Sequence, residues 1–122
     1  MTLKEATEKM TLQQRQSLFA WNISKLIDFI NNSSHKVTFA EAWRSPEQAA
    51  LYAKEGKGIV HSLHIERLAI DLNLFDDSGK YLTEKSDYER FGAYWESLNP
   101  YNRWGGNFKT LVDCVHFEMQ NL

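Results

Sequence analysis

The chain has 122 residues, of which 43% are hydrophobic and 25% are charged, a composition typical of a folded globular protein rather than of a disordered segment. Its formal net charge is -2, and its lysines and arginines are interspersed with acidic residues, which argues against a nucleic-acid partner. Cys114 is the only cysteine, so an intramolecular disulfide and a cysteine-based zinc site are excluded. Any metal ion would have to be held by histidine and carboxylate side chains.

The sequence also argues against membrane insertion. No apolar run approaches the roughly 20 residues that span a bilayer, and the N-terminal segment lacks the hydrophobic stretch of a signal peptide. We therefore expect synthesis in the cytoplasm without an export signal. Because the chain has no repeat, low-complexity stretch or Pro-rich linker, we expect residues 1–122 to form one monomeric domain.

The first predicted helix begins after Thr11. The side chain of Thr11 can cap the helix, Gln14 stands at the reciprocal position of a capping box, and apolar residues then recur on one face as far as Ile30. The polar residues 31–34 are expected to end this helix.

A short strand and a second helix should follow. Residues 37–42 alternate and contain β-branched and aromatic side chains, which predicts a strand followed directly by Arg44. Ser45 and Pro46 are a helix cap and a first helical residue, so a helix is expected from there to about Glu55.

The rest of the chain predicts a hairpin, a third helix, a glycine-containing loop and a terminal strand. The expected ranges are 68–74 and 81–82 for the hairpin strands, with a turn at 76–80, then 88–98 for the helical face, 101–108 for the loop and 114–119 for the last strand. About three helices and a small, mainly antiparallel sheet make an α+β fold.

Three residues could form a metal site. Catalytic zinc sites use three protein ligands and leave a fourth position open, and His64, Asp71 and His116 could supply such a set. On a straight strand residues seven apart face opposite sides, so His64 and Asp71 converge only if His64 lies on the loop before the strand. The spacing alone leaves open an ordinary amphipathic stretch. Asp113 would reach the same site only from the start of the last strand, where it could act as a general base.

Two stretches resemble a known pair of motifs. Ser62-Leu63-His64 with Ala69-Ile70-Asp71, and Asp113 to Glu118, are similar in order and spacing to the zinc motifs of the D-alanyl-D-alanine carboxypeptidase and L-alanyl-D-glutamate peptidase family. Residues 42–48 resemble the segment of that family that carries an arginine facing the scissile carbonyl, and residues 104–106 resemble a loop of its endolysin-like branch. The resemblance covers roughly residues 37–119.

The resemblance implies a Hedgehog/DD-peptidase-like fold and a zinc cofactor. It implies that His64, Asp71 and His116 bind the metal, that Asp113 is the catalytic base and that Arg44 stabilises charge electrostatically.

The other candidate residues each have a structural role as the alternative to a functional one. Ser62 and Trp104 are candidate substrate contacts, with loop capping and core packing as their alternatives. Glu118 is expected to share a strand face with His116 and to orient it, unless it is an exposed strand carboxylate. His61 lies outside the motif and is expected not to touch the metal.

The implied activity is hydrolysis of the stem peptide of bacterial peptidoglycan. Asp113 and the loop at 104–106 favour an L-alanyl-D-glutamate endopeptidase. The alternatives are a D-alanyl-D-alanine carboxypeptidase on the same site and a non-catalytic zinc-containing binding module. A wall substrate without an export signal implies a phage or prophage endolysin that crosses the membrane with the help of a holin and then acts on the cell wall.

Overall fold

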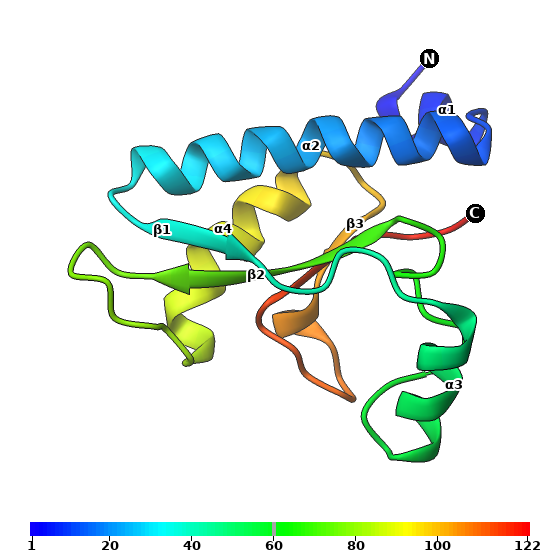
Figure 1. Ribbon diagram of the computed structural model, residues 1–122. Coiled ribbons are helices and arrows are strands. Elements are labelled where there is room, and N and C mark those ends of the chain that lie inside the picture. The colour runs from blue at the N-terminus through cyan, green and yellow to red at the C-terminus, as the bar shows by residue number, and fades with distance from the viewer. Residues whose placement is uncertain (60) are drawn as a thin grey trace.

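The computed structural model describes residues 1–59 and 61–122 and has an α+β fold. Its elements in chain order are α1 (Leu3–Glu8), α2 (Leu12–Asn32), β1 (Lys36–Phe39), α3 (Pro46–Lys54), β2 (Ala69–Phe75), α4 (Lys85–Ser97), β3 (Asn102–Trp104), the short 3-10 helix η1 (Gly105–Asn107) and β4 (His116–Met119). Figure 1 shows α2 running along one side of the strands and α3 on the opposite side. Among the described residues, no helix combines the length and the apolar character needed to cross a bilayer.

The four strands form one antiparallel sheet in the order β1-β2-β4-β3. This order places β2 and β4, which are far apart in the sequence, side by side at the centre of the sheet. The expected return strand at 81–82 is reduced to an isolated bridge between Phe75 and Tyr81. The predicted antiparallel sheet is therefore confirmed, although its hairpin is smaller than the sequence suggested.

Capping residues set the beginnings of the helices. Thr11 and Gln14 form the expected capping box at the start of α2, and Ser45 caps α3 with Pro46 at its first position. The short helix α1 was not predicted. It begins with a capping box of Thr2 and Glu5, a signal that the sequence does contain.

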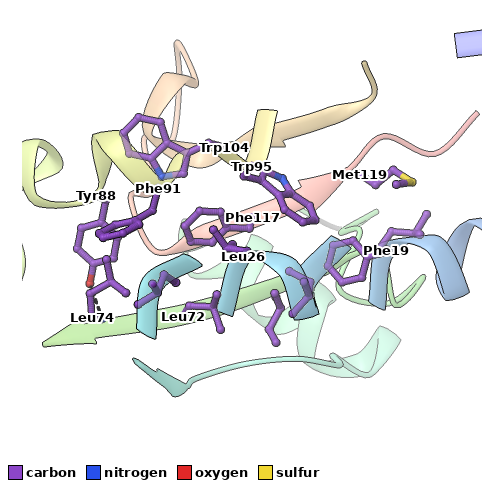
Figure 2. Packing of buried hydrophobic residues seen from close by; sticks show 14 residues of the cluster. Phe19, Leu26, Leu72, Leu74, Tyr88, Phe91, Trp95, Trp104, Phe117 and Met119 are labelled. Carbon is purple, nitrogen blue, oxygen red and sulfur yellow. Dashed lines mark hydrogen bonds between the residues drawn. The ribbon is translucent and has the colours of Figure 1, made fainter. Parts of the chain in front are cut away.

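The hydrophobic core lies between α2, α4 and one face of the sheet (Figure 2). Successive strand residues point to opposite faces, so alternate residues of β2 and β4 enter this core and the residues between them face away. The core side chains labelled in Figure 2 come from α2 (Phe19, Leu26), β2 (Leu72, Leu74), α4 (Tyr88, Phe91, Trp95), β3 (Trp104) and β4 (Phe117, Met119). The opposite face of the two central strands is thereby left to Asp71, His116 and Glu118.

The segment 101–108, expected to be a loop, contains β3 and η1. The reason is the packing of Trp104, whose ring occupies the space that a side chain would need at two glycines. A Cβ atom on Gly92 would lie 2.1 Å from this ring, and one on Gly106 would lie 2.2 Å from it. Gly106 therefore serves close packing and not a flexible loop, which is why the composition of the segment was misleading.

We expect Gly92→Ala to lower the free energy of unfolding by roughly 1–3 kcal/mol, the usual effect of overpacking a filled core. Helix propensity alone predicts the opposite sign, because alanine is favoured over glycine in a helix interior by about 1 kcal/mol. Urea denaturation measures the difference. Ala93→Gly, at the next and exposed position of α4, is the control for propensity alone. A stabilised Gly92→Ala variant would contradict the packing described here.

Candidate metal centre

His64, Asp71 and His116 come together although they lie far apart in the sequence. Asp71 of β2 and His116 of β4 are direct cross-strand partners, and His64 reaches them from the turn that precedes β2. One carboxylate oxygen of Asp71 lies 3.3 Å from Nε2 of His64 and 3.2 Å from Nδ1 of His116. The three residues offer ligand atoms that all lie within 4.8 Å of one another.

The turn before β2 is fixed by hydrogen bonds around Ser62. The backbone N–H of His64 donates to Oγ of Ser62 at 3.2 Å, and the backbone N–H of Ile65 donates to the carbonyl oxygen of Ser62 at 3.1 Å. Arg67 then adopts a left-handed conformation with φ of 57°, which turns the chain into β2. Ser62 thus has the loop-capping role that was the alternative to a substrate contact, although it also lines the cleft described below.

The donor set fits a zinc ion. Zinc bonds to histidine nitrogen and carboxylate oxygen are about 2.0–2.1 Å long, so two tetrahedral ligands lie about 3.4 Å apart. The contacts of Asp71 with the two histidines, at 3.3 and 3.2 Å, have this spacing. The second nitrogen of each ring is also engaged, because Nδ1 of His64 lies 3.2 Å from the carbonyl oxygen of Ala42 and Nε2 of His116 lies 2.7 Å from Glu118. Such contacts orient histidine ligands in metal sites.

The charged groups of this cluster shift one another's pKa values. Burial alone would raise the pKa of Asp71, but hydrogen bonds and positive charge from His116 and His64 hold it well below its usual range. Burial alone would lower the pKa of His116, but its contacts with Asp71 and Glu118 raise it to about 9. In the metal-free protein His116 is therefore a cation at neutral pH, and a metal ion would take the place of its Nδ1 proton.

Asp113 lies in the turn that leads into β4, next to the three candidate ligands. Its backbone N–H donates to the carbonyl oxygen of Gly105 at 3.0 Å, and its own carbonyl oxygen accepts from the N–H of His116 at 3.2 Å. Gly105 has no room for a side chain, since a Cβ atom there would lie 2.2 Å from the carbonyl oxygen of Asp113. Burial, and then the negative charge of Asp71, raise the pKa of the Asp113 carboxyl group. A carboxyl group with a raised pKa is suited to taking up and returning a proton.

Arg44 is held in place by three neighbours. Its Nε donates to Glu41 at 2.6 Å, its Nη1 donates to Oγ of Ser62 at 3.1 Å, and its guanidinium group lies 5.0 Å from the centre of the Tyr52 ring. Glu41 also lies 3.9 Å from Nδ1 of His64. Glu41 was not predicted as a site residue, because nothing in the local sequence pattern indicates that the chain turns after β1 and brings Glu41 and Arg44 together.

These groups surround one open cleft of about 760 Å³. One wall is formed by residues 57–59 and 61–64 and the other by residues 108–113. Of the predicted site residues, those that line the cleft are Arg44, Ser62, His64, Asp113, His116 and Glu118. His61 lines it too, on the rim outside the ligand cluster.

The expected substrate contact of Trp104 is wrong. Its side chain is in the core and only 1% exposed, and its indole N–H donates to the carbonyl oxygen of Cys114 at 2.7 Å. Trp104 therefore contacts the segment that carries Asp113 from the core side and does not face the cleft.

We expect the metal-free protein to lose stability as the pH rises from about 6.5 to 8.5. The folded-state pKa of His116, about 9, lies above the ordinary value of 6.5, so its contribution is complete below pH 6.5 and is lost as the pH approaches 9. A change of one in pKa corresponds to about 1.4 kcal/mol, which makes this contribution on the order of 3 kcal/mol.

Chemical denaturation in the presence of a chelator, at a series of pH values, measures this dependence. His116→Gln should remove most of the slope, whereas the exposed His61→Gln should retain it. A wild-type protein that is equally stable at pH 6.5 and pH 8.5 would contradict the assigned contacts of His116.

The chain is similar to a known protein family and to a solved structure. A family model described as D-alanyl-D-alanine carboxypeptidase matches residues 55–119, which is more than half of the chain and includes all three candidate ligands and Asp113. No curated protein matches the chain. Among solved structures, the crystal structure of the L-Ala D-Glu endopeptidase ChiX of Serratia marcescens is similar, with a TM-score of 0.60 and 22% sequence identity.

That similarity covers 69% of this chain and 66% of the endopeptidase chain, so this chain spans just under two thirds of the length of the other protein. At this level of identity the similarity establishes the fold. The family follows from the match over residues 55–119: the chain belongs to the D-alanyl-D-alanine carboxypeptidase family of peptidases.

Proposed function

We propose that the chain is a zinc-dependent peptidase that cuts the stem peptide of bacterial peptidoglycan. The observation that carries this proposal is the convergence of His64, Asp71 and His116 beside an open cleft that is lined by the two histidines together with Asp113 and Arg44. Membership of a peptidase family supports the chemistry. A role as a phage or prophage endolysin released by a holin is part of the same proposal.

The proposed mechanism uses His64, Asp71 and His116 to hold the metal and Asp113 to move the proton. The chemistry that zinc supplies at such a site is Lewis acidity, which polarises a scissile carbonyl and makes a water molecule more acidic. Asp113 takes the proton of the attacking water and passes it to the amine that leaves. In the metal-free protein, burial raises the pKa of Asp113, which makes its carboxylate a better proton acceptor.

Arg44 is proposed to stabilise the negative charge that develops on the carbonyl oxygen. It is always cationic, and its contacts with Glu41, Ser62 and Tyr52 fix its position before substrate arrives. A donor that is already in place costs no reorganisation during the reaction, and its loss lowers turnover by about a hundredfold to a thousandfold.

The preferred bond in this proposal is that between L-alanine and D-glutamate. The acid at the position of the base is Asp113, an aspartate and not the longer glutamate. In addition, the L-Ala D-Glu endopeptidase of Serratia marcescens has a similar fold. The basic residues Lys57 and Lys109 line the same cleft and suit a substrate that carries the carboxylate of glutamate.

A D-alanyl-D-alanine carboxypeptidase is the second candidate, and the description of the matched family favours it. A non-catalytic zinc-containing module is the third. Such a module would have no need for a base and a fixed arginine in the cleft, so the positions of Asp113 and Arg44 argue for catalysis.

We expect Asp113→Ala to bind zinc normally and to lower kcat by at least about a hundredfold, because the base is lost and the ligands remain. His64→Ala should lose both zinc and activity. Zinc content by metal analysis and turnover on purified muropeptides separate the two outcomes. Asp77→Ala, at an exposed turn position, is the control and should leave both unchanged. Near-normal turnover in Asp113→Ala would show that its assigned role is wrong.

The products identify the bond. An L-alanyl-D-glutamate endopeptidase should free an amino group on D-glutamate, and mass spectrometry of digested muropeptides should show fragments that begin with that residue. Release of C-terminal D-alanine would instead establish the carboxypeptidase. If the zinc-loaded protein leaves every muropeptide intact, the non-catalytic module is the remaining reading.

A further inference from the structure

Four side chains form a continuous row on the cleft side of the sheet: Asp71, His116, Glu118 and Arg103. Asp71 is the cross-strand partner of His116, and Arg103 is the cross-strand partner of Glu118. His116 and Glu118 are two residues apart on β4 and therefore share a face. The row follows directly from the register of β2, β4 and β3, so each member is placed by backbone pairing.

The contacts along this row use both oxygens of Glu118. Its Oε1 accepts from Nε2 of His116 at 2.7 Å, and its Oε2 accepts from Nε of Arg103 at 2.7 Å and also pairs with Nη2 of the same arginine. The Glu118 side chain is 7% exposed, whereas that of Arg103 is 45% exposed. A buried carboxylate is costly unless its oxygens are paired, and both oxygens are paired here.

Neighbouring residues stabilise this arrangement of Glu118. On the other side of β4 its cross-strand partner is Ala69, whose small side chain leaves room for the glutamate. From the core side, the indole N–H of Trp95 lies 3.0 Å from the carbonyl oxygen of Glu118 and 3.2 Å from that of Arg103. The backbone of the Arg103–Glu118 pair is thus held from the opposite face of the sheet.

We propose that Glu118 and Arg103 are positioning residues of the metal centre. Glu118 accepts the Nε2 hydrogen of His116, which fixes the ring so that Nδ1 faces Asp71 and His64. Arg103 holds Glu118 in the orientation that makes this contact. The inference rests on the zinc site proposed above. It takes up the orienting role that the sequence suggested for Glu118 and adds Arg103 as the residue that holds Glu118 in place; neither residue touches the metal.

Zinc affinity tests the role of Glu118 without any substrate. We expect Glu118→Gln to weaken zinc binding by about tenfold to a hundredfold, the usual effect of removing a carboxylate behind a histidine ligand. Competition with a chromophoric chelator measures the dissociation constant. The visible spectrum of the cobalt-loaded protein reports the geometry around the metal, and it should change in Glu118→Gln. The melting temperature in excess chelator shows that the variant is folded.

A double-mutant cycle tests the role of Arg103. If Arg103 acts through Glu118, Arg103→Gln should weaken zinc binding in the wild-type background and have little further effect in Glu118→Gln. Arg103→Lys should recover part of the loss, since it keeps the charge with a poorer fit to the carboxylate. Arg90→Gln, which removes an exposed arginine from α4, is the matched control and should leave zinc affinity unchanged.

The outcomes separate this inference from the proposed function. Wild-type protein that binds no zinc would overturn the metal site itself. Wild-type protein that binds zinc, with a Glu118→Gln variant of equal affinity and an identical cobalt spectrum, would overturn only the positioning role. Additive losses in the Arg103→Gln, Glu118→Gln pair would show that Arg103 does not act through Glu118.

Discussion

The pairing of β2 with β4 is the constraint on which the rest of the structure depends. Its register sets Asp71 opposite His116 on one face and Ile70 opposite Phe117 on the other. A slip of one residue would send the hydrophobic set into the cleft and the polar set into the core, because side chains alternate along a strand. The packing against α2 and α4 and the geometry of the candidate site therefore stabilise one and the same register.

Two acid–arginine ion pairs lie next to the candidate metal ligands. Glu41 pairs with Arg44 on the side of His64, and Glu118 pairs with Arg103 on the side of His116. The arginine of each pair offsets the cost of burying the carboxylate, and the pairing restricts a long side chain that lines the cleft. The charged groups that organise the site therefore include Glu41 and Arg103, which lie outside the sequence motifs.

The sequence predicted the parts of the molecule that depend on local pattern. Helix starts such as Thr11 follow from capping chemistry, and the candidate ligands follow from spacing combined with a family resemblance. Glu41 and Arg103 could not be assigned in this way, because their importance comes from the turn after β1 and from cross-strand register. Trp104 was misplaced for a related reason. The adjacent Gly105 and Gly106 are typical of a loop by composition, whereas in the fold both are needed for close packing, Gly105 against Asp113 and Gly106 against the Trp104 ring.

The position of Trp104 links the core to the chemistry. Its ring rests on Gly92 of α4, while its N–H holds the carbonyl oxygen of Cys114, next to Asp113. Substitutions on the buried side of α4 will therefore displace the wall of the cleft from inside, without touching a residue that substrate could reach. In a random-mutagenesis screen for lost activity, some of the strongest alleles should map to this helix, where a surface-based search for the active site would never look.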